Sequence, residues 1–201
     1  DSGAQGTATV EDVGAAGSVS VMDYTGVADA HIEKNAVIDI DNGDLKVNAL
    51  NDITTVNFSG NISSPITMLP WATWESTKNR FKNDVWGTEA EGAAIGGAAV
   101  AAHHKFTAKA YIEDSDMLNS ELTGSVSADN VNVDAKNDTL NLTLAASGGK
   151  SGSVGIDGTV NVTLTDNVTE AYIGQANVSA ETGSVKVKAI DNALVAALGG
   201  D

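Results

Sequence analysis

Runs in which small or β-branched apolar residues alternate with polar residues recur along the chain. Three of these runs share one pattern: each begins at a glycine, alternates over its first half and closes on the triplet A-[HY]-I, covering residues 17–32, 97–112 and 158–173. A period of two residues is typical of a half-buried β-strand, whereas an amphipathic helix has a period of 3.6. Three copies with the same internal spacing predict a repeat architecture built from strands.

The segments after each triplet recur in the same order. A second alternating strand closes on an alanine, and an Asn/Asp pair follows two residues later. The alanines are Ala49, Ala135 and Ala189, and the pairs are Asn51-Asp52, Asn137-Asp138 and Asp191-Asn192. We expect these pairs to form tight corners, because Asn and Asp tolerate left-handed φ, and their amides to form hydrogen-bonded ladders along a stack. A column of metal-binding carboxylates is the functional alternative.

The repeat predicts three modules within a single domain of residues 1–201. The modules cover about 13–61, 93–149 and 150–201. Equivalent residues of the triplets should occupy equivalent inward positions, namely Ala30, Ala110 and Ala171, and Ile32, Ile112 and Ile173. His31, Tyr111 and Tyr172 should share a slot for packed rings. His103 and His104 should point to opposite faces of one strand.

Residues 62–92 interrupt the repeat. They hold both prolines, all three tryptophans (Trp71, Trp74 and Trp86) and the only arginine. Trp74, Phe81 and Val85 fall at helical spacing, which predicts one short amphipathic helix over 71–86, laid against the outside of the strands. Packing explains the tryptophans most simply. The alternative is an exposed aromatic patch, with Trp71, Trp74 and Trp86 as ligand-binding residues for a glycan or a partner protein.

Composition and charge restrict the partners. The formal net charge is −16 and aromatic residues are 4% of the chain, so we expect no binding to nucleic acid and a thin core of Val, Ile, Leu and Ala. No run reaches the 18 or more apolar residues of a membrane helix, and we expect no membrane insertion. The chain has no cysteine and begins with Asp, so we expect a mature or excised piece.

Residues that could bind a metal are few and poorly spaced. Asp39, Asp41 and Asp44 resemble the start of a calcium loop, but Leu50 stands where such a loop needs a bidentate Glu. We interpret this stretch as a turn around Asn42-Gly43 and expect no metal and no other cofactor. None of the common motifs for hydrolysis, phosphate binding or dinucleotide binding occurs, and basic residues are scattered, so we expect no enzyme.

Several phrases resemble a known family. VMDYTGVADAHI, HKFTAKAYIEDS, NDTLNLTLAASGGKSGSVGIDGTVNV and DNVTEAYIG are similar to segments of the large, repetitive, leukotoxin LktA-like filamentous adhesins of anaerobic bacteria, which are similar to haemagglutinin-type surface proteins. The resemblance covers nearly the whole chain. It implies a right-handed parallel β-helix, a cell-surface or extracellular location, and a role in adhesion or filament scaffolding. It brings no catalytic residue.

The sequence therefore predicts an all-β fold, a right-handed parallel β-helix (solenoid) with one short helical insertion. The expected function is a structural stalk or filament segment of a bacterial adhesin. The alternative is a glycan- or protein-binding module that acts through the insertion, and a polysaccharide-degrading β-helix is a third class. Because both ends of the chain fall at one phase of the repeat, we expect head-to-tail stacking with other copies or continuation into further modules.

Overall fold

The structure, a computed structural model, describes residues 2–4, 8–33, 35–60, 88–113 and 124–200. Every regular element in these ranges is a β-strand. In chain order the strands are β1 (Ser2–Ala4), β2 (Ala8–Val10), β3 (Val13–Ile32), β4 (Val37–Asp39), β5 (Asp44–Gly60), β6 (Thr88–Ala90), β7 (Ala93–Glu113), β8 (Ser125–Ala128), β9 (Asn130–Ala146), β10 (Gly149–Ser151), β11 (Val154–Ile156), β12 (Thr159–Gly174), β13 (Asn177–Ala180) and β14 (Val185–Gly200).

The strands form four sheets, and the chain runs through the sheets three times in the same order. The sheets are β1-β5-β9-β14, β10-β6-β2, β11/β12-β7-β3 and β13-β8-β4. Every strand pairing is parallel. We call β2–β5 the first pass, β6–β9 the middle pass and β10–β14 the third pass. The predicted all-β fold with stacked parallel strands is confirmed.

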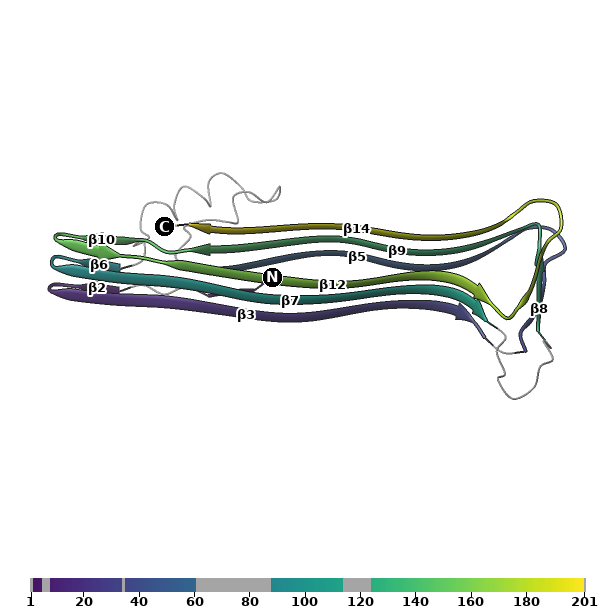
Figure 1. Cartoon of the computed structure of the whole chain (residues 1–201), viewed down its shortest axis with the longest axis horizontal. Coiled ribbons are helices and arrows are strands. Elements are labelled where there is room, and N and C mark those ends of the chain that lie inside the picture. Colours follow the sequence, from purple (N-terminus) through teal and green to yellow (C-terminus); the bar gives the residue numbers. More distant parts are fainter. Residues whose placement is uncertain (1, 5–7, 34, 61–87, 114–123, 201) are drawn as a thin grey trace.

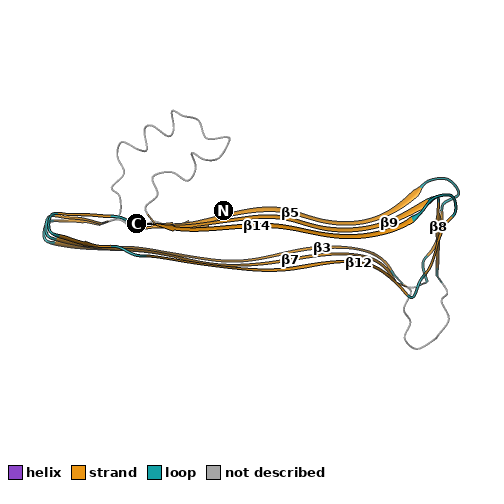
Figure 2. Ribbon diagram, turned by 45° about the horizontal axis from the view of Figure 1, so that its top comes forward, coloured by secondary structure: helices purple, strands orange, loops and turns teal. Residues whose placement is uncertain are grey.

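Two long sheets face each other across the interior. Figure 1 shows β3, β7 and β12 side by side, with β5, β9 and β14 above them, and Figure 2 shows the two sheets as separate layers. At one end the short sheet that contains β8 runs across from one layer to the other (Figure 2). β3 has 20 residues and β7 has 21, so these two strands extend over about 65–70 Å at roughly 3.3 Å per residue.

The strand register confirms the predicted equivalences. Ala30 pairs with Ala110, which pairs with Ala171, and Ile32, Ile112 and Ile173 are aligned in the same way. Gly17 pairs with Gly97, and the Ala98 backbone N–H donates to the Gly158 carbonyl 3.0 Å away. The alternating pattern thus identified which residues of the three passes lie side by side.

The apolar core occupies the half of the molecule near β8. Its fully buried members come mostly from the middle pass, because β7 and β9 have neighbours on both sides. They are Val47, Ala49, Ala108, Ala110, Ile112, Val126, Ala128, Val131, Val133 and Ala135. Ala30, Ile32, Ala171 and Ile173 are partly buried and pack against this cluster, as expected for the inward positions of the triplets.

The other half of the interior, which we call the polar half, combines a small buried cluster of Ala98, Val100 and Ala145 with many buried polar side chains, and these polar side chains differ from the predicted core of Val, Ile, Leu and Ala. Ser20 Oγ donates to Asn57 Oδ1 at 2.6 Å, and Ser59 Oγ donates to Ser18 Oγ at 2.9 Å. These bonds join the two long sheets. The alternate positions on the same strands therefore face outward, and Val21 is 74% exposed. Hydrogen bonds between small side chains therefore act beside the small apolar cluster here.

The Asn/Asp pairs lie inside strands, so the prediction of tight corners is wrong. β5 and β9 run without a break through Asn51-Asp52 and Asn137-Asp138, and Ala49, Ala135 and Ala189 do not close their strands. The predicted amide ladder is confirmed, because Asn51 Nδ2 donates to Asn137 Oδ1 at 2.9 Å. Asn51 Nδ2 also donates to the Thr107 carbonyl of the facing sheet at 2.8 Å, which satisfies a buried amide.

The predicted helix over 71–86 lies outside the described residues, and no helix occurs within them. Thr88–Ala90, within the predicted insertion of 62–92, form β6, which pairs with both β2 and β10. These residues therefore take part in the repeat. The module boundaries stay a prediction.

Removing residues 63–87 is expected to leave the stacked strands folded. Gly60 aligns with Ala146 and Thr88 with Gly149, and between the middle and third passes only Ser147-Gly148 joins the equivalent strand ends. A two-residue link of Asn61-Ile62 should therefore span the same gap. We expect the circular dichroism of β-structure and a cooperative urea transition to persist. A control that replaces this link by Ser-Gly copies the natural connection, and loss of the β signal in both variants would contradict the prediction.

Candidate functional site: side-chain columns across the three passes

A column of aromatic rings follows the outer side of the β3-β7-β12 sheet. His31 and Tyr111 have ring centroids 5.0 Å apart with an interplanar angle of 16°, and Tyr111 and Tyr172 are 5.0 Å apart with an angle of 5°. The predicted slot for packed rings is confirmed. Because the rings lie face to face, each ring covers its neighbour, and only the two end rings, His31 and Tyr172, have one ring face that the column leaves uncovered.

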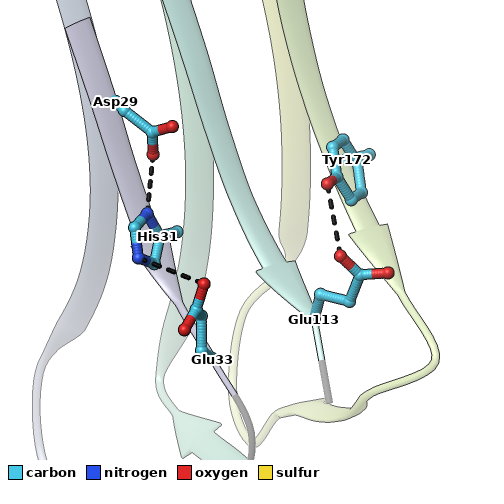
Figure 3. Close-up of polar contacts among 5 residues, drawn as sticks. All are labelled: Asp29, His31, Glu33, Glu113 and Tyr172. Carbon is cyan, nitrogen blue, oxygen red and sulfur yellow. Dashed lines mark hydrogen bonds and ion pairs between the residues drawn. The ribbon is translucent and has the colours of Figure 1, made fainter. Parts of the chain in front are cut away.

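Carboxylates surround the two ends of this column, as Figure 3 shows. His31 Nδ1 lies 2.6 Å from Asp29 Oδ1 and His31 Nε2 lies 3.5 Å from Glu33 Oε1. The hydrogen bond to Asp29 raises the pKa of His31 above its usual value, with smaller contributions from the Asp29 and Glu33 charges and a partial opposing effect of burial. Tyr172 Oη donates to Glu113 Oε2 at 3.3 Å. Burial, followed by the Glu113 charge, raises the pKa of Tyr172.

A column of alternating charge lies beside the rings. The register aligns Asp29 of β3 with Lys109 of β7 and Glu170 of β12. Lys109 Nζ is 2.8 Å from Glu170 Oε2, and this hydrogen bond raises the pKa of Lys109. The side chains of Lys109 and Glu170 are 37% and 47% exposed, so water screens the pair and its contribution to stability is small. The column does, however, place a cation between two carboxylates.

The adjacent histidines point to opposite faces, as predicted. His103 faces outward, where its Nδ1 lies 3.4 Å from Asp23 Oδ1 and its Nε2 lies 3.1 Å from Asp166 Oδ2. His104 faces inward and is fully buried. One histidine therefore links the outer passes through carboxylates, and the other belongs to the interior.

The surroundings of His104 favour the neutral ring. Thr55 Oγ1 donates to Asn141 Oδ1 at 2.8 Å and lies 3.3 Å from His104 Nε2, so Nε2–H of the histidine donates to this hydroxyl. Among the described residues Nδ1 has no hydrogen-bond partner. Protonation would place a second N–H at this buried position without an acceptor. Burial, and then the neighbouring His103, lowers the pKa of His104, while Asp23 opposes this.

The contribution of His104 to the free energy of unfolding should fall as the pH drops below about 6.5, the usual pKa of an unfolded histidine. Because folding lowers the pKa of His104, the unfolded chain binds more protons below that pH, and the slope from this group is at most about 1.4 kcal/mol per pH unit. Urea unfolding from pH 8 to 5 should show a shallower slope for His104→Gln than for the native chain.

His31→Gln is the matched control, since the pKa of His31 is raised and its contribution has the opposite sign. Stability from His31 is present below about pH 6.5 and is lost as the pH rises through its folded pKa. Removing it should abolish a gain of stability as the pH falls towards about 6.5 and leave the loss below that pH in place. Identical pH profiles for the native chain and His104→Gln would contradict the assignment of a buried, neutral His104.

Of the residues predicted as ligand sites, only the three aspartates lie in the described structure. Trp71, Trp74 and Trp86 lie outside the described residues. Asp39, Asp41 and Asp44 are exposed, and Asp44 Oδ1 accepts a hydrogen bond from Asn130 Nδ2 at 2.8 Å. No group of three or more His, Asp or Glu in the described part of the chain is arranged to hold a metal ion. The Asn42-Gly43 turn is confirmed, and it connects β4 to β5 with Gly43 at φ 140°.

Sequence reasoning missed the charge column, although a signal for it was present. The residue before the alanine of each A-[HY]-I triplet is charged, and its sign alternates from Asp29 to Lys109 to Glu170. Once the triplets are known to be in register, these three residues must be neighbours on the outer face.

Comparison with models of known protein families, with curated proteins and with solved structures gives no match. Within the residues that the structure describes, no helix has the length and apolar character needed to cross a bilayer.

Proposed function

We propose that this chain is a structural segment, a stalk or filament element, of a bacterial cell-surface or secreted adhesin. It folds as part of a right-handed parallel β-helix in which each pass is one coil, and it acts without catalysis. The observation that carries this proposal is the register of the three passes, which aligns like residues in columns along the stack.

Columns of this kind suit a load-bearing stack. Asn, Thr and Ser side chains join neighbouring passes and also the two long sheets, and the apolar core is shared by the passes, so each pass is held by its neighbours. Repeat proteins gain stability from such nearest-neighbour contacts, and they can be extended by adding further units.

The strands at the ends of the stack support extension. Among the described strands, β12 pairs only with β7 and β14 only with β9, so each leaves one edge without a strand. Unpaired edges of this length pair readily with another strand. The proposed partners are therefore further coils, from another copy or from the same longer chain, outside the cell or at its surface.

Labelling of the source cells tests the function. Antibodies raised against the purified chain, used for immunogold electron microscopy on intact cells, should decorate filaments or the cell surface. Brief protease treatment of intact cells should remove the label. Label confined to the cell interior, and unchanged by protease, would overturn the proposal.

A further inference from the structure

The first and third passes carry charges of like sign at equivalent positions, so these two passes are not complementary to each other. In the β3-β7-β12 sheet the outer strands hold the acids Asp29 and Glu170, and the middle strand holds Lys109. In the facing sheet Lys46 of β5 and Lys186 of β14 flank the uncharged Asn132 of β9. At these positions both outer passes are therefore acidic on the β3-β7-β12 sheet and basic on the facing sheet.

This pattern determines what fits the open edges of β12 and β14. If the register continues, a second identical copy would place its Asp29 beside Glu170 and its Lys46 beside Lys186, along the part of its β5 edge that its own β1 does not cover. Both contacts bring like charges to adjacent strands, about 4.8 Å apart, and such pairs are unfavourable. A pass with the charges of the middle pass would instead place a lysine beside Glu170 and an amide beside Lys186.

A second pair of residues favours the same partner. Lys188 of β14 aligns with Asp134 of β9, so the β14 edge has basic residues at two positions on one face. The β12 edge has Asp166 and Glu170, and its last ring, Tyr172, continues the aromatic column. The edge is therefore acidic and aromatic on one sheet and basic on the other.

We propose that the β12/β14 edge binds a further β-pass of the middle type in preference to an identical copy. Such a pass places a lysine opposite Glu170 and an aromatic ring opposite Tyr172. It places a carboxylate or an amide opposite Lys186 and Lys188. This inference rests on the proposed stacking function and specifies its partner. The charge columns set both the register and the choice of neighbour.

Reversing Lys186 tests the preference against an identical copy. Lys186→Glu places a carboxylate beside Lys46 of the next copy, whereas its neighbour within the chain is the uncharged Asn132. Sedimentation velocity at about 10 mM salt, where the Debye length is about 30 Å, should show at least a fivefold stronger self-association than the native chain. The variant is more negative overall, so an effect of net charge would act in the opposite direction.

Lys188→Glu is the matched control. It changes the net charge equally, on the same face of the same strand, but it would lie beside the uncharged Asn48 of the next copy and beside its own Asp134. It should not increase association, and the difference between the variants should vanish at about 1 M salt, where the Debye length is about 3 Å. Equal association of both variants and the native chain would overturn the preference.

A chain with an inverted charge column tests the partner directly. The triple variant Asp29→Lys, Lys109→Glu, Glu170→Lys keeps opposite charges adjacent within the chain, and circular dichroism checks its fold. Mixed with the native chain at low salt, it should form mixed assemblies at least fivefold more readily than either chain alone. If mixing has no effect while immunogold still labels surface filaments, the partner inference fails and the structural function stands. If the triple variant does not fold, the Lys186→Glu comparison decides.

Discussion

Replacing Ile112 by Asp is expected to lower the free energy of unfolding by about 3–5 kcal/mol, the range for an uncompensated buried charge. Ile112 is 2% exposed and lies in the apolar cluster, between Ile32 and Ile173 of the neighbouring strands. A carboxylate there would lose its hydration and the packing of the isoleucine. Urea unfolding followed by circular dichroism measures the effect.

Two further substitutions show whether burial is the cause. Ile173→Asp changes an equivalent residue of the third pass, which is only partly buried because β12 has a neighbour on one side among the described strands, so its cost should be smaller. Val21→Asp changes an outward residue that is 74% exposed, and its effect should stay within about 0.5 kcal/mol. Equal losses at Ile112 and Val21 would contradict the inward placement of the triplet isoleucines.

The pairing of the three passes was predictable because it follows from spacing. The fixed distance between Gly17 and Ala30, repeated in two later copies, allows only one alignment in which every apolar position keeps its face. A slip of one residue would turn each side chain to the other side of the sheet. The ring column of His31, Tyr111 and Tyr172 follows from the same alignment.

The choice of the inner face in the polar half was not predictable from alternation. In the run GSVSV, serines and valines alternate, and the period of two shows only that each type shares a face. A general preference for buried valine predicts the wrong face here. Ser18 and Ser20 face inward because the facing sheet offers them polar partners. Ser20 donates a hydrogen bond to Asn57, and Ser18 accepts one from Ser59. Those contacts join residues about 40 positions apart in the chain.

Turn propensity was misleading at the Asn/Asp pairs for a similar reason. Asn and Asp favour corners when their side chains bond their own backbone. Asn51 and Asn137 instead bond each other and the facing sheet, so tertiary contacts keep them in extended strands. Of the candidate sites, the sequence indicated the position of the rings but not the carboxylates and lysine beside them.

Replacing Phe106 by Ala is expected to cost about 3–5 kcal/mol, the usual range for removing a buried aromatic ring. Phe106 is 0% exposed and is the largest fully buried side chain among the described residues. Its ring centroid lies 5.8 Å from that of Tyr24 and 6.0 Å from that of His104. Loss of the ring would therefore leave a cavity at the boundary between the apolar and polar halves, and urea unfolding measures its cost.

The space for this ring depends on Gly26, which pairs with Phe106 on the adjacent strand. A Cβ at Gly26 would lie 3.1 Å from Phe106 Cδ1 and 2.8 Å from Ile53 Cδ1, so Gly26→Val alone should destabilise by about 1–3 kcal/mol through overpacking. In the Phe106→Ala background the added side chain can occupy part of the cavity. The double variant should therefore lose less stability than the sum of the single variants, by about 0.5–3 kcal/mol.

Gly17→Val is the control for this cycle, because a Cβ there meets only the Gly97 carbonyl at 3.6 Å. Its effect should add to that of Phe106→Ala, and additivity at Gly26 as well would show that the glycine does not make room for the ring.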